Sequence, residues 1–153
     1  LLIPIQTSSE EYIFRGYLMQ GFANLAQNKW FPLLMTSVIF GGMHIFNPEV
    51  AKIGYIVLVY YIGTGLLLGI ITLMDEGMEL ALGFHAANNL VGALLVTSDW
   101  SAFQTNSIFK DISDPSAGLD VILPVVLIYP ILLFIFSKKY NWTNWKEKLT
   151  GNI

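Results

Sequence analysis

Pairs of residues four apart, each with at least one polar side chain, recur inside otherwise apolar stretches of this sequence. The pairs are Glu11 with Arg15, Phe40 with His44, and His85 with Asn89. Residues four apart lie on one face of a helix, so each pair predicts a polar stripe that faces a shared interior. An ionisable group near the centre of a membrane segment costs at least ~2.5–3.5 kcal/mol, which favours a functional role for these residues.

The three charged residues near the start of the chain divide into two roles. We expect Glu11 and Arg15 to form a supporting ion pair along their helix. Glu10 lies about 100° around the helix from Glu11 and cannot share Arg15 equally. It is therefore the free carboxylate and the candidate general base. Alternatively, Glu10 only favours a helix start through the macrodipole, with Ser8 as N-cap of a capping box closed by Glu11.

Together with Glu10, the two histidines and Asn89 are residue types that suit hydrolysis of an amide bond. A carboxylate and an imidazole can hold and deprotonate a water. A second imidazole and a carboxamide can stabilise the oxyanion that forms when this water attacks. The sequence contains no cysteine, and no serine stands in a nucleophile motif.

A metal is the alternative for the same residues. Glu10, His44 and His85 form a ligand set known for catalytic zinc, with a fourth position left open. The His-Glu-x-x-His motif of zinc peptidases is absent from the sequence. We therefore favour no metal and no other cofactor, with zinc as the alternative.

Two further functions use the same residues without hydrolysis. A membrane scaffold or immunity protein would use them only to pack helices, and Glu10, His44 and His85 would then face different directions. A proton or ion pathway would need a continuous polar file, but the apolar spans 53–74 and 121–137 contain no ionisable residue.

The elements that must position these residues are apolar and helical. The chain is 54% hydrophobic and 12% charged, against about 25% charged in soluble domains. We predict an all-α fold, a polytopic transmembrane helical bundle of about five spans in a single domain covering residues 1–153, with its active site within the membrane. The expected segments are 7–26, 30–46, 53–74, 78–97 and 121–137, with a polar loop at 98–118.

Glycines and prolines are expected to shape these segments. Gly65 and Gly69 are expected to let a neighbouring helix approach closely. Gly41 and Gly42, between Phe40 and His44, suit a crowded interior. Pro124 and Pro130 are expected to bend the last span. His44 and His85 can meet only if segment 30–46 is short or tilted and ends within the membrane.

Charge predicts the orientation and excludes one class of partner. The net charge is −3 and no basic stripe suggests nucleic-acid binding. The lysines near the end of the chain, Lys138, Lys139, Lys146 and Lys148, predict a cytoplasmic C-terminus. The sequence begins at Leu1, where we expect no signal peptide, and we expect it to be the C-terminal part of a longer chain.

Three motifs, in this order on separate apolar segments, carry a resemblance to a known family. They are Glu10-Glu11-x-x-x-Arg15, Phe40-x-x-x-His44 and His85-x-x-x-Asn89. Over about residues 7–95 the sequence resembles the CPBP intramembrane proteases. This family includes CAAX prenyl endopeptidases and bacteriocin-processing enzymes, also described as abortive-infection (Abi) proteins.

The resemblance implies an integral membrane enzyme that cleaves a peptide or protein substrate at the lipid bilayer. It implies that Glu10 is the catalytic base, that His44 holds the water, and that His85 and Asn89 form the oxyanion site. The family has been described both as metalloproteases and as glutamate-dependent proteases, and we favour the second. CAAX-type cleavage, bacteriocin processing and self-immunity are the implied functions, and the bacterial plasma membrane is the expected location.

Overall fold

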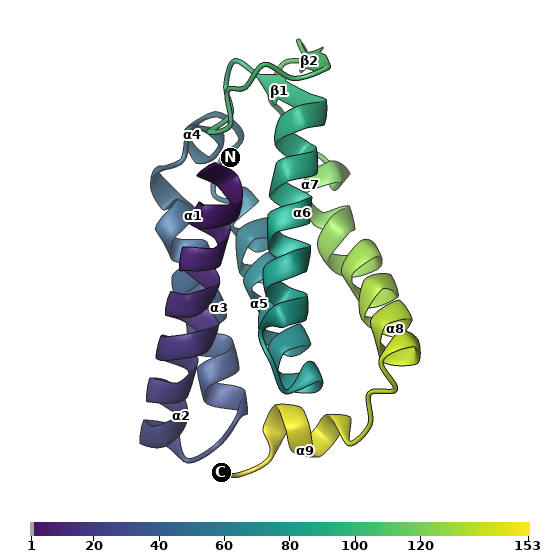
Figure 1. Cartoon of the computed structure of the whole chain (residues 1–153). Helices are drawn as coiled ribbons and strands as arrows, with labels where there is room; N and C mark the ends of the chain where they lie inside the picture. Colours follow the sequence, from purple (N-terminus) through teal and green to yellow (C-terminus); the bar gives the residue numbers. More distant parts are fainter. Residues whose placement is uncertain (1) are drawn as a thin grey trace.

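The computed structural model describes residues 2–153, and helices make up most of it (Figure 1). The first long helix is continuous through α1 (Leu2–Glu11), the π-helical segment η1 (Tyr12–Leu18) and α2 (Met19–Ala26). It is followed by α3 (Trp30–Met43), the 3₁₀ turn η2 (His44–Phe46) and the short α4 (Pro48–Ile53). As predicted, Asn47 and Pro48 end the second segment, because Asn47 is extended before the proline.

The second half of the chain begins with two long helices, α5 (Val57–Asp75) and α6 (Glu79–Leu95). The last span consists of α7 (Leu119–Leu123), the π-helical η3 (Pro124–Ile128) and α8 (Tyr129–Lys139). The irregular segment falls at Pro124, where a proline was expected to disturb the helix. Finally, α9 (Trp145–Thr150) lies across the end of the molecule near the C-terminus (Figure 1).

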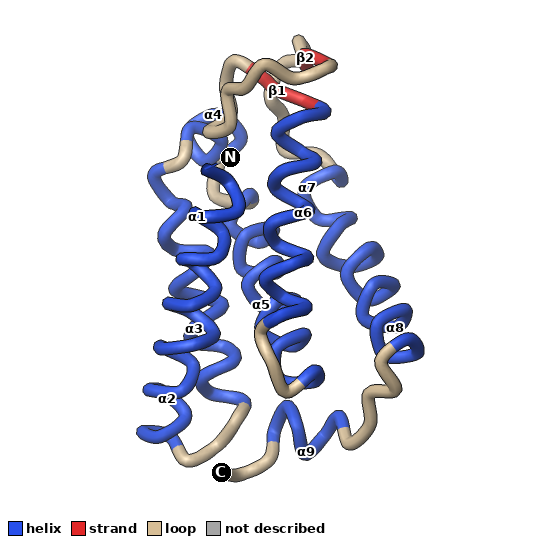
Figure 2. Tube along the Cα trace, in the orientation of Figure 1, coloured by secondary structure: helices blue, strands red, loops and turns tan. Residues whose placement is uncertain are grey.

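The polar loop after α6 contains a short sheet that the sequence analysis did not predict. β1 (Val96–Ser98) pairs in parallel with β2 (Phe109–Asp111). Figure 2 shows these strands in red at the end of the molecule opposite α9. Three-residue strands give too short a pattern for an alternation of polar and apolar residues to be recognised.

The expected N-cap at Ser8 is wrong. The helix already contains Leu2, so Ser8 lies in the interior of α1. Pro4 falls in the first turn of the described helix, where proline is tolerated. The hydroxyls of Thr7 and Ser9 donate to carbonyls four residues earlier, those of Ile3 and Ile5, at 3.1 and 2.8 Å. These hydroxyls therefore bond within the helix, and the capping-box pattern is not used.

Helices α3 and α5 pack closely through glycines. A Cβ on Gly65 would lie 3.0 Å from the Cα of Ser37, so the predicted close approach at Gly65 is confirmed. A Cβ on Gly41 would lie 2.9 Å from the backbone nitrogen of Ile62. Gly42 faces open space, so only the first of the two adjacent glycines is needed for packing.

The expected number of about five spans is not confirmed. Among residues 2–153, two helices are long and apolar enough to cross a membrane, residues 57–75 and 119–139. The helix at 30–46 is apolar but shorter. The first long helix and α6 are less apolar because they contain the charged and polar residues of the first and third motifs.

Candidate active site

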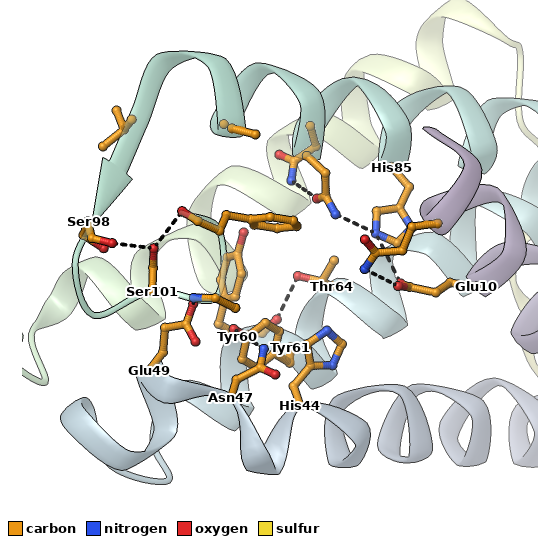
Figure 3. Close-up of a pocket in the computed structure, with 18 of the residues that line it drawn as sticks. Glu10, His44, Asn47, Glu49, Tyr60, Tyr61, Thr64, His85, Ser98 and Ser101 are labelled. Carbon is orange, nitrogen blue, oxygen red and sulfur yellow. Dashed lines mark hydrogen bonds and ion pairs between the residues drawn. The ribbon is translucent and has the colours of Figure 1, made fainter. Parts of the chain in front are cut away.

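The motif residues converge on one cavity of about 680 Å³. Its wall includes Glu10 from α1, His44 from the turn after α3, and His85 from α6 (Figure 3). Asn89, also from α6, lines the same cavity. The two histidines therefore line the same cavity, and α3 is short, since it ends at Met43. This arrangement differs from the expectation for a packing-only protein, in which these side chains face different directions.

The Glu11–Arg15 ion pair predicted along the first helix is present. Arg15 Nη1 donates to Glu11 Oε1 at 3.1 Å, and both side chains are fully buried. Arg15 Nη2 also donates to the carbonyl of Gly65 at 2.8 Å, which ties the first helix to α5. The guanidinium lies 4.8 Å from the centre of the Phe40 ring, within cation–π range. Arg15 thus contacts both packed helices beside the cavity.

Glu11 has a second role that the sequence analysis missed. The oxygen that accepts from Arg15, Oε1, lies 2.7 Å from His85 Nδ1. A carboxylate can only accept hydrogen bonds, so His85 Nδ1 carries a proton and donates it to Glu11. This contact joins residues 74 apart in sequence. The spacing of four that revealed the pairs reports only neighbours within one helix.

The other nitrogen of His85 faces the remaining motif residues. Nε2 lies 3.8 Å from Glu10 Oε2 and 3.4 Å from Asn89 Nδ2. A neutral His85 has a lone pair at Nε2 and can accept from Asn89 there. An imidazolium can instead donate at both nitrogens, since each has a carboxylate oxygen opposite it.

His44 is held by its own helix. Its Nδ1 lies 2.8 Å from the Phe40 carbonyl, which can only accept, so Nδ1–H donates and Nε2 is left available. The Phe40 ring lies close to both histidines, with its centre 5.0 Å from the His44 ring and 5.9 Å from the His85 ring. Phe40 is 2% exposed, so its ring is closely packed where it contacts both imidazoles.

The sequence analysis expected Glu10 to be a free carboxylate, but its side chain has a hydrogen-bond partner. Its Oε1 accepts from the Gln6 side chain at 3.1 Å, and its side chain is 21% exposed. Gln6 and Glu10 are four residues apart, so this partner could have been found from spacing. The partly exposed Glu10, in contrast to the enclosed Glu11, has access to the cavity and to water.

Three further groups on the cavity wall were not singled out from sequence. Tyr61 from α5 stacks on His44, and Asn47 donates to the Tyr61 hydroxyl at 3.3 Å. Glu49 accepts from the backbone N–H of Ala102 at 2.7 Å, which holds the loop after β1 against α4. None of these residues belongs to a motif with a spacing of four, and each acts between separate elements.

The alternative zinc site does not form as these residues lie. Among residues 2–153, no group of three or more histidine, aspartate or glutamate side chains is close enough to hold a metal ion. Glu10, His44 and His85 share the cavity but do not converge on one point as a ligand set, and we derive no catalytic step through a metal.

Comparison with known families identifies the family of the chain. The family described as "Type II CAAX prenyl endopeptidase Rce1-like" matches residues 1–91, which include all three motifs. The chain belongs to this family, as the resemblance implied, and the family is one of proteases. Family membership and the apolar helices together indicate association with a membrane.

One curated relative aligns with the chain. It is the uncharacterized protein YyaK of Bacillus subtilis (strain 168), 36% identical over 103 residues. The alignment covers 67% of this chain but 34% of the relative, so the chain spans about a third of that protein's length. No solved structure matches the chain.

Proposed function

We propose that the protein is an intramembrane endopeptidase that hydrolyses a peptide bond with a water activated by Glu10 and His44. One observation carries the proposal: Glu10, His44, His85 and Asn89, from three helical segments, line a single cavity. The hydrogen bond from Nδ1–H of each histidine leaves its Nε2 as the remaining functional nitrogen. The family's description supports a peptide or protein as substrate.

The first step uses the partly exposed carboxylate. Glu10 accepts a proton from a water that His44 Nε2 holds by hydrogen bonding, and the water oxygen attacks the scissile carbonyl carbon. The carbonyl oxygen becomes an oxyanion. Asn89 Nδ2 and a protonated His85 Nε2 donate hydrogen bonds to it. This role needs His85 as the imidazolium, because its Nδ1 proton is already engaged with Glu11.

The second step breaks the carbon–nitrogen bond. The tetrahedral intermediate collapses, the oxyanion re-forms a carbonyl, and the leaving amine takes the proton that Glu10 received. Glu10 returns to its carboxylate form, and no covalent intermediate with the enzyme is formed. The step balances with water as the only co-reactant.

Replacement of Glu10 tests the proposal. Glu10→Gln keeps the size of the side chain and removes the base, so cleavage of a quenched fluorescent peptide library in lipid vesicles should fall by at least ~100-fold. Glu79→Gln is the matched control, since Glu79 is exposed and lies outside the cavity. Both variants should keep the elution volume and melting temperature of the wild type.

Two results would contradict the proposal. Cleavage by Glu10→Gln at the wild-type rate would show that Glu10 is not the base. A wild-type protein that cleaves nothing in the library would contradict the endopeptidase function itself. Treatment with 1,10-phenanthroline tests the metal alternative separately. We expect unchanged activity, whereas loss that zinc restores would assign the reaction to a metalloprotease.

A further inference from the structure

We propose that Tyr61 is a positioning residue that holds the His44 imidazole for catalysis, with Asn47 as its anchor. The Tyr61 and His44 rings stack with centres 4.1 Å apart and an angle of 18° between their planes (Figure 3). Tyr61 comes from α5, whereas His44 follows α3. The inference rests on the proposed function, because it assigns the device that orients one of its reacting groups.

His44 needs such a device because of where it lies. It follows the last residue of α3 and begins a single 3₁₀ turn, with backbone angles outside the α-helical region. Short 3₁₀ turns have poorer hydrogen-bond geometry than α-helices. The bond from Nδ1 to the Phe40 carbonyl fixes the tautomer, but both groups belong to the same end of α3. This bond alone does not place the ring relative to the rest of the bundle.

Tyr61 supplies the contact from a second helix. Its ring covers one face of the imidazole, while the Phe40 ring lies at a tilt of 50° with its centre 5.0 Å away. Two aromatic neighbours from different helices restrict rotation of the imidazole about its bond to Cβ. The Nε2 edge of the imidazole is therefore held in one direction within the cavity that both residues line.

Asn47 connects His44 to Tyr61 and so closes a loop of contacts. Its backbone N–H donates to the His44 carbonyl at 2.9 Å, and its side chain donates to the Tyr61 hydroxyl at 3.3 Å. The path thus runs from His44 through Asn47 and Tyr61 back to the His44 ring. A closed path of this kind fixes the aromatic stack more firmly than stacking alone, because neither ring can slide without breaking a hydrogen bond.

The two histidines make the test direct. The chain contains His44 and His85 as its two histidines, so selective ¹⁵N-histidine labelling gives signals from two side chains. In Tyr61→Leu, we expect His44 ring signals that are shifted and broadened by motion of the ring, and no change at His85. Tyr61→Phe keeps the stack and loses the tie to Asn47, so it should lie between wild type and Tyr61→Leu. Tyr55→Leu, at a residue 71% exposed, is the control.

Activity provides the second readout. A misplacement of a reacting group by about 1 Å can cost about 100-fold, so kcat of Tyr61→Leu should fall by up to about that factor, with Tyr61→Phe restoring much of it. A change confined to KM would mean that Tyr61 binds substrate instead and would overturn the proposal.

The two readouts separate the failure of this proposal from that of the protease function. An unchanged His44 signal in Tyr61→Leu overturns the positioning role, whatever the protein catalyses. A changed His44 signal with wild-type kcat also overturns it, since the ring would then move without consequence. If the wild type cleaves no peptide, the protease function fails, and the labelled histidine signals still decide whether Tyr61 holds His44.

Discussion

The adjacent glycines Gly41 and Gly42 allow a sharp test of how helix packing builds the site. Both lie near the end of α3, just before His44. A Cβ on Gly42 would meet nothing within 4 Å. A Cβ on Gly41 would lie 2.9 and 3.0 Å from the backbone nitrogen and Cα of Ile62, and closer still to its side-chain Cγ1. Alanine at Gly42 should therefore raise the free energy of unfolding, whereas alanine at Gly41 should lower it.

The magnitude follows from two opposing effects. Replacing glycine by alanine within a helix gains up to about 1 kcal/mol in the free energy of unfolding. Gly42→Ala should show this gain, reduced near the helix end. Gly41→Ala has the same gain but must push α5 away, and overpacking of this kind costs about 1–3 kcal/mol. Because the propensity gain is nearly common to both variants, Gly41→Ala should be less stable than Gly42→Ala by about 1–3 kcal/mol.

The assay is reversible unfolding in mixed micelles with increasing denaturing detergent, combined with peptide cleavage. Gly41→Ala should also cleave more slowly, because Tyr61 precedes Ile62 on α5 and moves with it away from His44. Adding Ile62→Ala should restore only part of the stability, since it removes the Cγ1 contact but leaves the backbone contacts. Equal stabilities of the two glycine variants would refute the close packing of α3 on α5 at this point.

The same unfolding assay checks two further predictions. Arg15→Met should lower the free energy of unfolding by about 3–5 kcal/mol, because it leaves the buried Glu11 carboxylate without its ion-pair partner. The double variant with Glu11→Gln and Arg15→Met should lose less stability than the two single changes added together. Ser8→Ala should change stability by no more than about 0.5 kcal/mol, as for a residue inside a helix, and a loss of about 1 kcal/mol would instead restore its role as an N-cap.

Contacts within one helix could be predicted from the sequence. A spacing of four predicted the Glu11–Arg15 ion pair, and uncharged stretches predicted the helices at 30–46 and 57–75 to within a few residues. Gly65 was recognised as a point of close approach because small residues have that use in apolar helices. These features depend on the period of the helix and on side-chain size, which the sequence contains directly.

Contacts between helices could not be predicted in the same way. The bond from His85 to Glu11 and the stack of Tyr61 on His44 depend on the rotation and separation of packed helices. The sequence pattern predicts which face of its own helix a residue lies on. It does not predict which face of another helix that residue will contact. The extension of α1 back to Leu2 was missed for a different reason, since Ser8 matches a capping pattern that a continuous helix leaves unused.

The contacts of Glu11 change how the charged cluster divides into structural and catalytic residues. One oxygen of Glu11 accepts from both Arg15 and His85, and its other oxygen has no partner among the described residues. Arg15 holds that oxygen from one side, so the direction in which His85 points depends on the ion pair. The hydrogen bond at Nδ1 leaves only Nε2 of His85 to face Glu10 and Asn89. The division therefore holds for Arg15, which stays a structural residue. It does not hold for Glu11, because a change at Glu11 also changes the hydrogen bonding and orientation of His85.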